Sequence, residues 1–232
     1  MRQLARRGLA EFVGTGFLVA AVIGSGIAAT RLSPGQPGLQ LLENSLITGG
    51  ALVALILALQ PVSAAFNPVV TALERALGGI GTREAGVLIL AQFGGGFVGA
   101  LVANLMFDRA AVDLATQHRS GTGRWLGEVV ATLGLLLVVF GTIRSDRAER
   151  VAFAVGGYIL AAYWFTSSTS FANPAVTVSR MFSDSFAGIA PASVPGFVLA
   201  QLLGGVLGYG LVRGLYPEAA SRPLGPDREV AT

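Results

Sequence analysis

The sequence predicts an all-α integral membrane protein with six transmembrane helices and two re-entrant half-helices, arranged as two inverted repeats. Three observations support this prediction: an apolar composition, the spacing of the charged residues, and a set of motifs that occurs twice. Of the 232 residues, 53% are hydrophobic and only 12% are charged, against roughly 25% charged in a typical soluble domain. A single soluble core could not bury so much apolar surface, so soluble enzymes and soluble binding modules are excluded.

The spacing of the charged residues predicts the number and length of the spans. A helix that crosses about 30 Å of hydrocarbon needs roughly 20 residues. Two uncharged intervals, 44–73 with 30 residues and 151–179 with 29, are too long for one span and too short for two. Each fits one span followed by a half-helix, whose irregular backbone must be buried in protein or line a wet cavity. The predicted spans are about 9–31, 40–60, 83–107, 124–143, 150–168 and 191–214, with half-helices near 67–77 and 173–184.

The charged residues also indicate an orientation and exclude some functions. All 16 basic residues are arginines that lie between apolar runs, so we attribute the net charge of +3 to cytoplasmic loops and not to nucleic-acid binding. With the N-terminus inside, eleven arginines face the cytoplasm and five face out, which predicts two cytoplasmic termini and a cytoplasmic tail at 217–232. A cleaved signal peptide is the alternative interpretation of the first span. Because the chain has no cysteine and one histidine, His118, we expect no metal site, no cofactor and no enzymatic activity.

Three motifs occur twice, in the same order. EFVGT at 11–15 recurs as EVVAT at 128–132, and NPVVT at 67–71 recurs as NPAVT at 173–177. AQ at 91–92, followed by Gly95, Gly96 and Gly99, recurs as AQ at 200–201, followed by Gly204, Gly205 and Gly208. These matches predict two homologous halves, about 9–107 and 124–214, within one membrane domain, 1–232. Each half holds three full spans, an odd number, so the second half lies upside down relative to the first. Inverted repeats place the functional site at their interface, near the membrane midplane.

Each half-helix begins with Asn-Pro, at 67–68 and at 173–174. Asparagine is a preferred N-cap and proline a preferred first helical residue. Inversion points the two helix N-termini at each other, each equivalent to about half a positive elementary charge. The asparagine amides donate at this depth, and carbonyls of the non-helical stretches 63–66 and 168–172 accept. The sequence therefore predicts a narrow polar path that passes neutral hydrogen-bonding molecules and repels protons and cations.

Taken together, these residues resemble those of the major intrinsic protein family, the aquaporins and aquaglyceroporins, over nearly the whole chain. The resemblance implies a right-handed bundle in the cell inner (plasma) membrane, usually a homotetramer with one pore in each subunit. It also implies that the carboxylates Glu11 and Glu128 brace the buried loop backbones. The pore boxes that it implies are Asn67, Pro68 and Val69 in the first half and Asn173, Pro174 and Ala175 in the second.

Two residues depart from the family pattern. Val69 stands where the first box usually has alanine, and we expect it to affect packing against the partner half-helix more than the choice of substrate. Val176 stands where most relatives have an arginine that helps to form the outer constriction. Arg180 follows four residues later, and we expect it at a surface or an interface more than as a substitute for the missing arginine.

The other positions of the constriction, counted from the two asparagines, fall at Ile47 with Thr48 adjacent, at Ala161 and at Ser170. With Val176 they predict a wide outer filter, whereas strict water channels of the family carry histidine and arginine there. The chain thus resembles the arginine-less bacterial members that are associated with arsenite. We expect a passive channel for water, glycerol-like polyols and undissociated arsenous acid. The alternatives are a strict water channel and a proton-coupled secondary transporter that uses the intramembrane glutamates.

Overall fold

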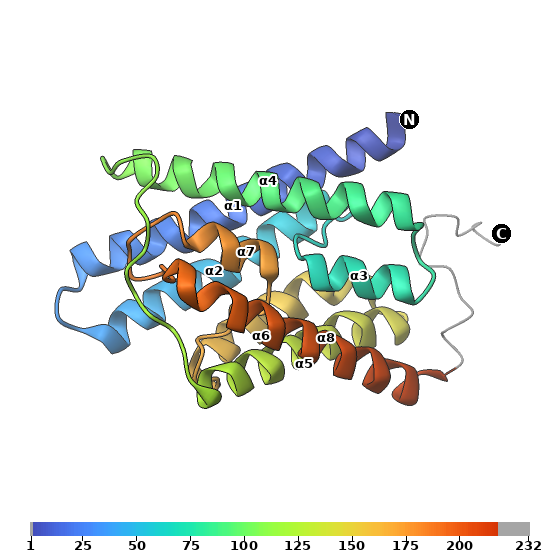
Figure 1. Ribbon diagram of the computed structural model, residues 1–232. Helices are drawn as coiled ribbons and strands as arrows, with labels where there is room; N and C mark the ends of the chain where they lie inside the picture. Colours follow the sequence, from blue (N-terminus) through green and yellow to red (C-terminus); the bar gives the residue numbers. More distant parts are fainter. Residues whose placement is uncertain (1, 218–232) are drawn as a thin grey trace.

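The computed structural model describes residues 2–217, and the regular elements of this part of the chain are all helical (Figure 1). This confirms the predicted fold class, and both half-helices are present as α3 and α7. Apart from residue 217, the predicted tail 217–232 lies outside the described residues. The α-helices are α1 (Arg2–Leu32), α2 (Pro37–Leu59), α3 (Pro68–Ala76), α4 (Thr82–Met106), α5 (Thr122–Arg144), α6 (Val151–Phe165), α7 (Pro174–Arg180) and α8 (Val194–Leu215), with 3-10 turns η1 (Ala148–Arg150) and η2 (Pro191–Ser193).

Five of the described helical stretches are long and apolar enough to cross a membrane, namely α1, α2, α4, α5 and the stretch that ends in α8. The remaining predicted span is α6, whose 15 residues rise only about 22 Å. The turn η1 directly precedes α6 and adds about 6 Å. Together they approach the hydrocarbon thickness of about 30 Å, so the six-span prediction agrees with the structure although α6 ends earlier than predicted.

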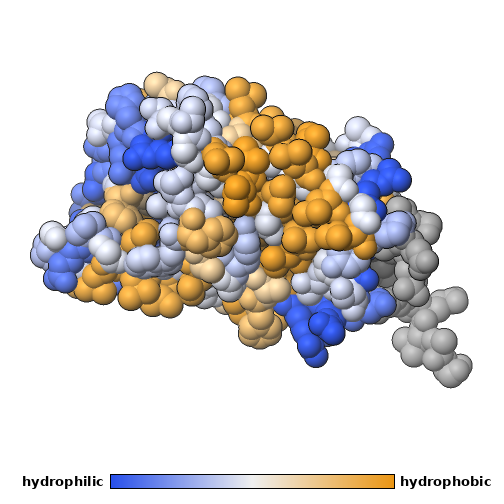
Figure 2. Space-filling view, turned by 90° about the horizontal axis from the view of Figure 1, so that it is seen from below, coloured by the Kyte–Doolittle hydropathy of each residue, from blue (hydrophilic) through white to orange (hydrophobic). Residues whose placement is uncertain are grey.

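The outer surface is apolar where a bilayer would surround it. Figure 2 shows hydrophobic residues across the middle of one face and hydrophilic residues concentrated toward its two ends. Large apolar side chains of all six long helices are exposed, among them Phe17, Leu90, Phe153 and Val206. Such a continuous exposed apolar surface is expected for a protein whose solvent is lipid.

The helices of the two predicted repeats pack in corresponding ways. Helix α1 packs along α4 and against α2, while α5 packs along α8 and against α6. The α1–α4 pair and the α5–α8 pair lie on opposite sides of the molecule, and α3 and α7 approach each other between them (Figure 1). One apolar cluster joins both halves and includes Val22, Leu52, Leu135 and Val155. This arrangement places the two Asn-Pro sequences near the centre of the bundle.

Glycines allow the long helices to approach closely. A Cβ atom on Gly95 would lie 2.0 Å from the carbonyl oxygen of Phe12, and one on Gly204 would lie 2.7 Å from that of Val129. Both distances are shorter than any real contact, so only glycine fits at these crossings. The glycine runs therefore set the spacing between α1 and α4 and between α5 and α8, as small residues commonly do between membrane helices.

Candidate functional site

Each half-helix is capped by its asparagine. The Oδ1 atom of Asn67 accepts a hydrogen bond from the backbone N–H of Val69 (3.0 Å). The Oδ1 atom of Asn173 accepts from Ala175 (3.0 Å) and Val176 (3.2 Å). Each helix then begins at the proline that follows, which has no N–H to leave unsatisfied. The predicted local role of the two Asn-Pro sequences is thus confirmed.

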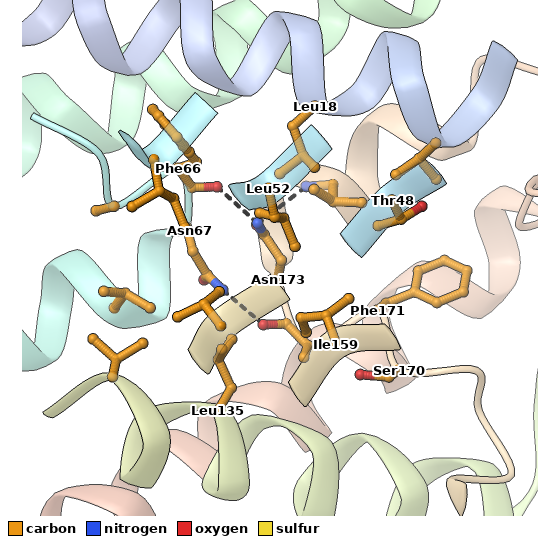
Figure 3. A pocket seen from close by; sticks show the side chains of 18 of the residues that line it. Leu18, Thr48, Leu52, Phe66, Asn67, Leu135, Ile159, Ser170, Phe171 and Asn173 are labelled. Carbon is orange, nitrogen blue, oxygen red and sulfur yellow. Dashed lines mark hydrogen bonds between the residues drawn. The ribbon is translucent and has the colours of Figure 1, made fainter. Parts of the chain in front are cut away.

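The two asparagines also bond to the opposite half of the molecule (Figure 3). The Nδ2 group of Asn67 donates to the carbonyl oxygen of Ala172 (2.7 Å), and that of Asn173 donates to the carbonyl oxygen of Phe66 (2.7 Å). This reciprocal pair of hydrogen bonds brings the N-terminal ends of α3 and α7 together. Because each end carries a partial positive charge, the centre of the bundle is electropositive.

The loops before the asparagines have an unusual backbone. Phe66 and Ala172 both have φ of +48°, and Ser170 has φ of +50°. The left-handed region is rarely occupied by residues other than glycine and costs roughly 1–3 kcal/mol at each position. This conformation turns the carbonyls of Phe66 and Ala172 toward the asparagines that bind them. Other interactions must compensate for its cost.

Glu11 holds the first of these loops. Its carboxylate is fully buried and accepts four hydrogen bonds. The donors are the backbone N–H groups of Ala65 (2.8 Å) and Phe66 (2.7 Å), the hydroxyl of Ser63 (2.6 Å) and the Nε2 group of Gln92 (2.8 Å). An ionised carboxylate has about four acceptor sites, so this arrangement uses all of them.

Glu128 holds the second loop in the same way. It is also fully buried, and it accepts from the backbone N–H groups of Phe171 (2.9 Å) and Ala172 (2.8 Å) and from the Nε2 group of Gln201 (2.6 Å). Gln201 also donates to the hydroxyl of Thr177 (2.8 Å), which ties the loop to α7 and α8. The two glutamates therefore lie where the family resemblance implies, each against a loop backbone.

A cavity passes both asparagines and is apolar along most of its wall. Figure 3 shows Leu18, Leu52, Leu135 and Ile159 around the two asparagines. The residues with polar side chains that line this cavity are Thr48, Asn67, Tyr163, Ser170, Asn173 and Arg180. Toward the N-terminal end of α1 a second cavity adjoins the first, because both are lined by Ile56, Ala64, Ala65, Val70, Val139 and Val151. A path thus leads from the asparagines to the end of the molecule where Arg2 and Arg6 lie.

Comparison with known proteins assigns the family. Residues 1–170 match the sequence model of the family described as major intrinsic protein. The chain belongs to the major intrinsic protein family. It is 46% identical over 222 residues to the aquaglyceroporin AqpS of Rhizobium meliloti (strain 1021), which covers 95% of this chain and 94% of that protein. It is also 32% identical over 182 residues to the probable aquaporin TIP2-2 of Oryza sativa subsp. japonica, covering 72% of this chain and 71% of the relative.

A solved structure has the same fold. The X-ray structure of the aquaglyceroporin from Plasmodium falciparum superposes with a TM-score of 0.69 at 18% sequence identity, covering 93% of this chain and 98% of the other. The chain is therefore a multi-pass membrane channel of the major intrinsic protein family, and not an enzyme.

The positions predicted for the family's outer constriction agree with the structure only in part. Thr48, Ser170 and Val176 line the cavity. Ile47 is 47% exposed, and Ala161 is also exposed, so neither lies in the path. Neighbouring residues of an α-helix point about 100° apart, so a count that is wrong by one or two residues turns a side chain to the outer face. The corrected position on α6 is Tyr163.

Tyr163 was not foreseen from the sequence as a residue of the path. Its hydroxyl lies 3.2 Å from the hydroxyl of Thr48, within hydrogen-bonding distance. The two residues come from α6 and α2, which pack against each other. They place a pair of hydroxyl groups at the wall of the path, which the apolar Val176 also lines.

Val69 and Arg180 also lie in other surroundings than expected. Val69 packs against Gly205 of α8, since a Cβ atom at Gly205 would lie 2.8 Å from its Cγ1 atom. Its predicted effect on packing thus concerns α8 and not only the partner half-helix.

Arg180 is not a surface residue: it is only 2% exposed, and it lines the cavity. The sequence signal was its spacing of four residues from Val176, which places both on the same face of α7.

Proposed function

We propose that this chain is a passive channel for water and small neutral hydroxylated solutes, such as glycerol and undissociated arsenous acid. The observation that supports this most is the cavity that passes Asn67 and Asn173 and combines a largely apolar wall with a few polar side chains. A solute in this path can donate to exposed carbonyls and accept from asparagine amides, while its carbon atoms contact the apolar wall. The printed name of the 46% identical relative, an aquaglyceroporin, agrees with this class of solute.

The outer filter in this proposal consists of Thr48, Tyr163, Ser170 and Val176. Three of these residues bring hydroxyl groups to the wall, and Val176 brings a small apolar side chain. A valine at this position occupies much less space than an arginine and offers no N–H donors. The filter is therefore wide enough for solutes larger than water, which favours a glycerol-conducting channel over a strict water channel.

The two buried glutamates fit a passive channel better than a proton-coupled transporter. Glu11 accepts four hydrogen bonds and Glu128 at least three. Protonation of Glu11 would place a hydrogen on an oxygen that already faces a donor, so the loop would have to break to let a proton pass. Both carboxylates therefore serve the backbone of the path, and flux follows the solute gradient.

We also propose a homotetramer in a bacterial plasma membrane, with one path in each subunit and both termini in the cytoplasm. The orientation rests on the distribution of arginine, because Arg2, Arg6 and Arg7 lie at the N-terminal mouth. The assembly rests on the family resemblance. We retain 9–107 and 124–214 as the two repeats of a single domain.

Stopped-flow swelling of liposomes that contain the full chain tests this function with water, glycerol, urea and arsenous acid. We expect non-saturating flux of all neutral solutes and no accompanying proton movement. Flux of water alone would reject the wide filter, and saturating flux that moves protons would establish a coupled transporter.

The substitution Val176→Arg tests the filter itself. A guanidinium beside Thr48 and Tyr163 fills the path, and we expect glycerol and arsenous acid flux to fall about tenfold while water flux changes little. Val112→Arg is the matched control, because Val112 is exposed in the connector between α4 and α5. Unchanged selectivity in Val176→Arg would contradict this account of the filter.

A further inference from the structure

Arg180, the last residue of α7, is a buried cation without an ion-pair partner among the described residues. It is only 2% exposed, and the ion pairs of the described part of the chain do not include it. Its Nε group donates to the carbonyl oxygen of Ala187. Within residues 2–217 this is the single hydrogen bond of the guanidinium, so both of its terminal nitrogens remain free to donate.

A buried charge without a counter-charge is costly unless polar groups or water solvate it. Arg180 lines the central cavity, where water or a solute could do so. The side chain is therefore both buried in protein and open to the path. An arginine with only a structural role between two loops would not need this access to the cavity.

An aromatic ring fixes the orientation of the guanidinium. Its Cζ atom lies 3.4 Å from the centre of the Phe171 ring, in stacking contact. Phe171 in turn packs edge-on against the buried ring of Phe197, with ring centres 5.1 Å apart. The backbone N–H of Phe171 is held by Glu128 (2.9 Å). Because a guanidinium is planar and carries its donors in a rigid fork, this stacking determines the plane in which Arg180 can donate.

Arg119 lies near the same ring but has a different role. Its Cζ atom is 5.2 Å from the ring centre of Phe171, and its donors bind the carbonyl oxygens of Gly188 (2.8 Å) and Phe186 (3.0 Å). Burial, together with the positive charge of Arg180, lowers the pKa of Arg119 to about 9. Arg119 does not line the cavity. It links the connector between α4 and α5 to the loop that follows α7, and it places a second guanidinium near the Phe171 ring.

We propose that Arg180 supplies the positive charge and the N–H donors that Val176 leaves out of the outer passage. The side chain reaches the path from one helical turn further along α7. Its charge repels protons and metal cations, and its terminal nitrogens donate to the oxygen atoms of hydroxylated solutes. The smaller Val176 keeps the path wide at the same time. This inference rests on the proposed channel function, and it assigns cation exclusion to a specific residue.

The test uses the full chain in proteoliposomes and measures two quantities on each variant: osmotic water flux, and the leak of protons and K⁺ under an imposed potential. Arg180→Gln removes the charge, and Arg180→Lys keeps it. We expect the cation leak of Arg180→Gln to rise about tenfold or more, since a full charge within a few ångströms of the path is lost. Arg180→Lys should keep the low leak, and water flux should change by less than about threefold in both. Arg31→Gln is the matched control, because Arg31 is an exposed arginine on the same side of the molecule.

The outcomes separate this inference from the proposed function. If the unmodified chain conducts neither water nor neutral solutes, the proposed function fails. If it conducts them and the cation leak of Arg180→Gln equals that of the unmodified chain, this inference alone is overturned. A purely structural role would lower stability and all fluxes together without a selective rise in cation leak. Should Arg180→Gln not fold, Arg180→Met provides the same comparison, because its thioether can pack on the Phe171 ring without a charge.

Discussion

The two mouths of the path, for which we propose that the one near Arg7 is the inner and the one near Arg180 the outer, carry opposite charges at positions that correspond in the two predicted repeats. The seventh residue after the first asparagine is Glu74, and the seventh after the second is Arg180. The third residues are Val70 and Val176, and both line the cavity. Glu74 lies 3.9 Å from Arg7, so the inner charge has a partner, whereas Arg180 has none among the described residues. The backbones of the two half-helices thus correspond, and we propose that the charges at the mouths determine which end discriminates between solutes.

The centre of the molecule is where the two halves should be most alike, and removal of a loop-bracing carboxylate should have the largest effect. We expect Glu11→Gln and Glu128→Gln each to lower the free energy of unfolding by about 3 kcal/mol or more. Glutamine offers one acceptor oxygen, and its NH2 group would face backbone N–H donors such as that of Phe66. Thermal unfolding in detergent measures the loss.

The exposed Glu149→Gln, at the turn between α5 and α6, serves as the control and should leave stability unchanged. Similar losses in the two buried variants would support equivalent roles in the two halves. A variant at Glu11 or Glu128 that is as stable as the unmodified chain but no longer transports solute would instead point to proton coupling.

Substitutions at the helix crossings should have effects that differ more between the two halves than substitutions at the centre. We expect Gly95→Ala to destabilise the protein by about 2–3 kcal/mol, and Gly204→Ala by less. The reason is that an added Cβ meets a backbone oxygen at 2.0 Å in the first case and at 2.7 Å in the second. Gly94→Ala, whose Cβ would make an ordinary 3.4 Å contact with Phe12, is the control on the same helix. Equal losses at Gly95 and Gly204 would mean that the first crossing relaxes more than its geometry suggests.

The sequence was sufficient for the topology and for the central pair of asparagines. Span lengths are set by the thickness of the bilayer, so two uncharged intervals of an unusual length revealed the half-helices before any coordinates were known. The duplicated Asn-Pro motif and the odd number of spans in each half then required Asn67 and Asn173 to converge. Both arguments depend on the lengths of segments and on their order along the chain, which can be read directly from a sequence.

The lining of the outer mouth could not be predicted in the same way. Which side of a helix faces the path depends on the rotation of that helix. A count along the chain placed Ile47, with Thr48 adjacent, and Ala161 in the filter, whereas the cavity is lined by Thr48 and Tyr163. The position of Arg180 depends on a loop that folds Ala187 over it. Such tertiary contacts leave no local signal. Only the spacing of four residues from Val176 could have indicated a shared face.

The smallest effect should come from the paired charge of the inner mouth. Arg7 forms ion pairs with Glu84 and, at 3.9 Å, with Glu74, and all three side chains are partly exposed. Pairs of this kind contribute up to about 1 kcal/mol and weaken with salt. We expect Arg7→Gln to lower the free energy of unfolding by less than that amount, and the difference should shrink further in high salt.

The cation leak of Arg7→Gln should stay as low as in the unmodified chain. Two carboxylates already neutralise the charge of Arg7, and the barrier at Arg180 and at the facing helix ends is untouched. The same liposome leak assay that is applied to Arg180→Gln measures this. A leak in Arg7→Gln as large as in Arg180→Gln would show that both mouths discriminate against cations. The paired Arg7 and the unpaired Arg180 would then contribute equally to the barrier against cations. The two mouths would differ in which charged residues they carry, but not in how strongly they exclude cations.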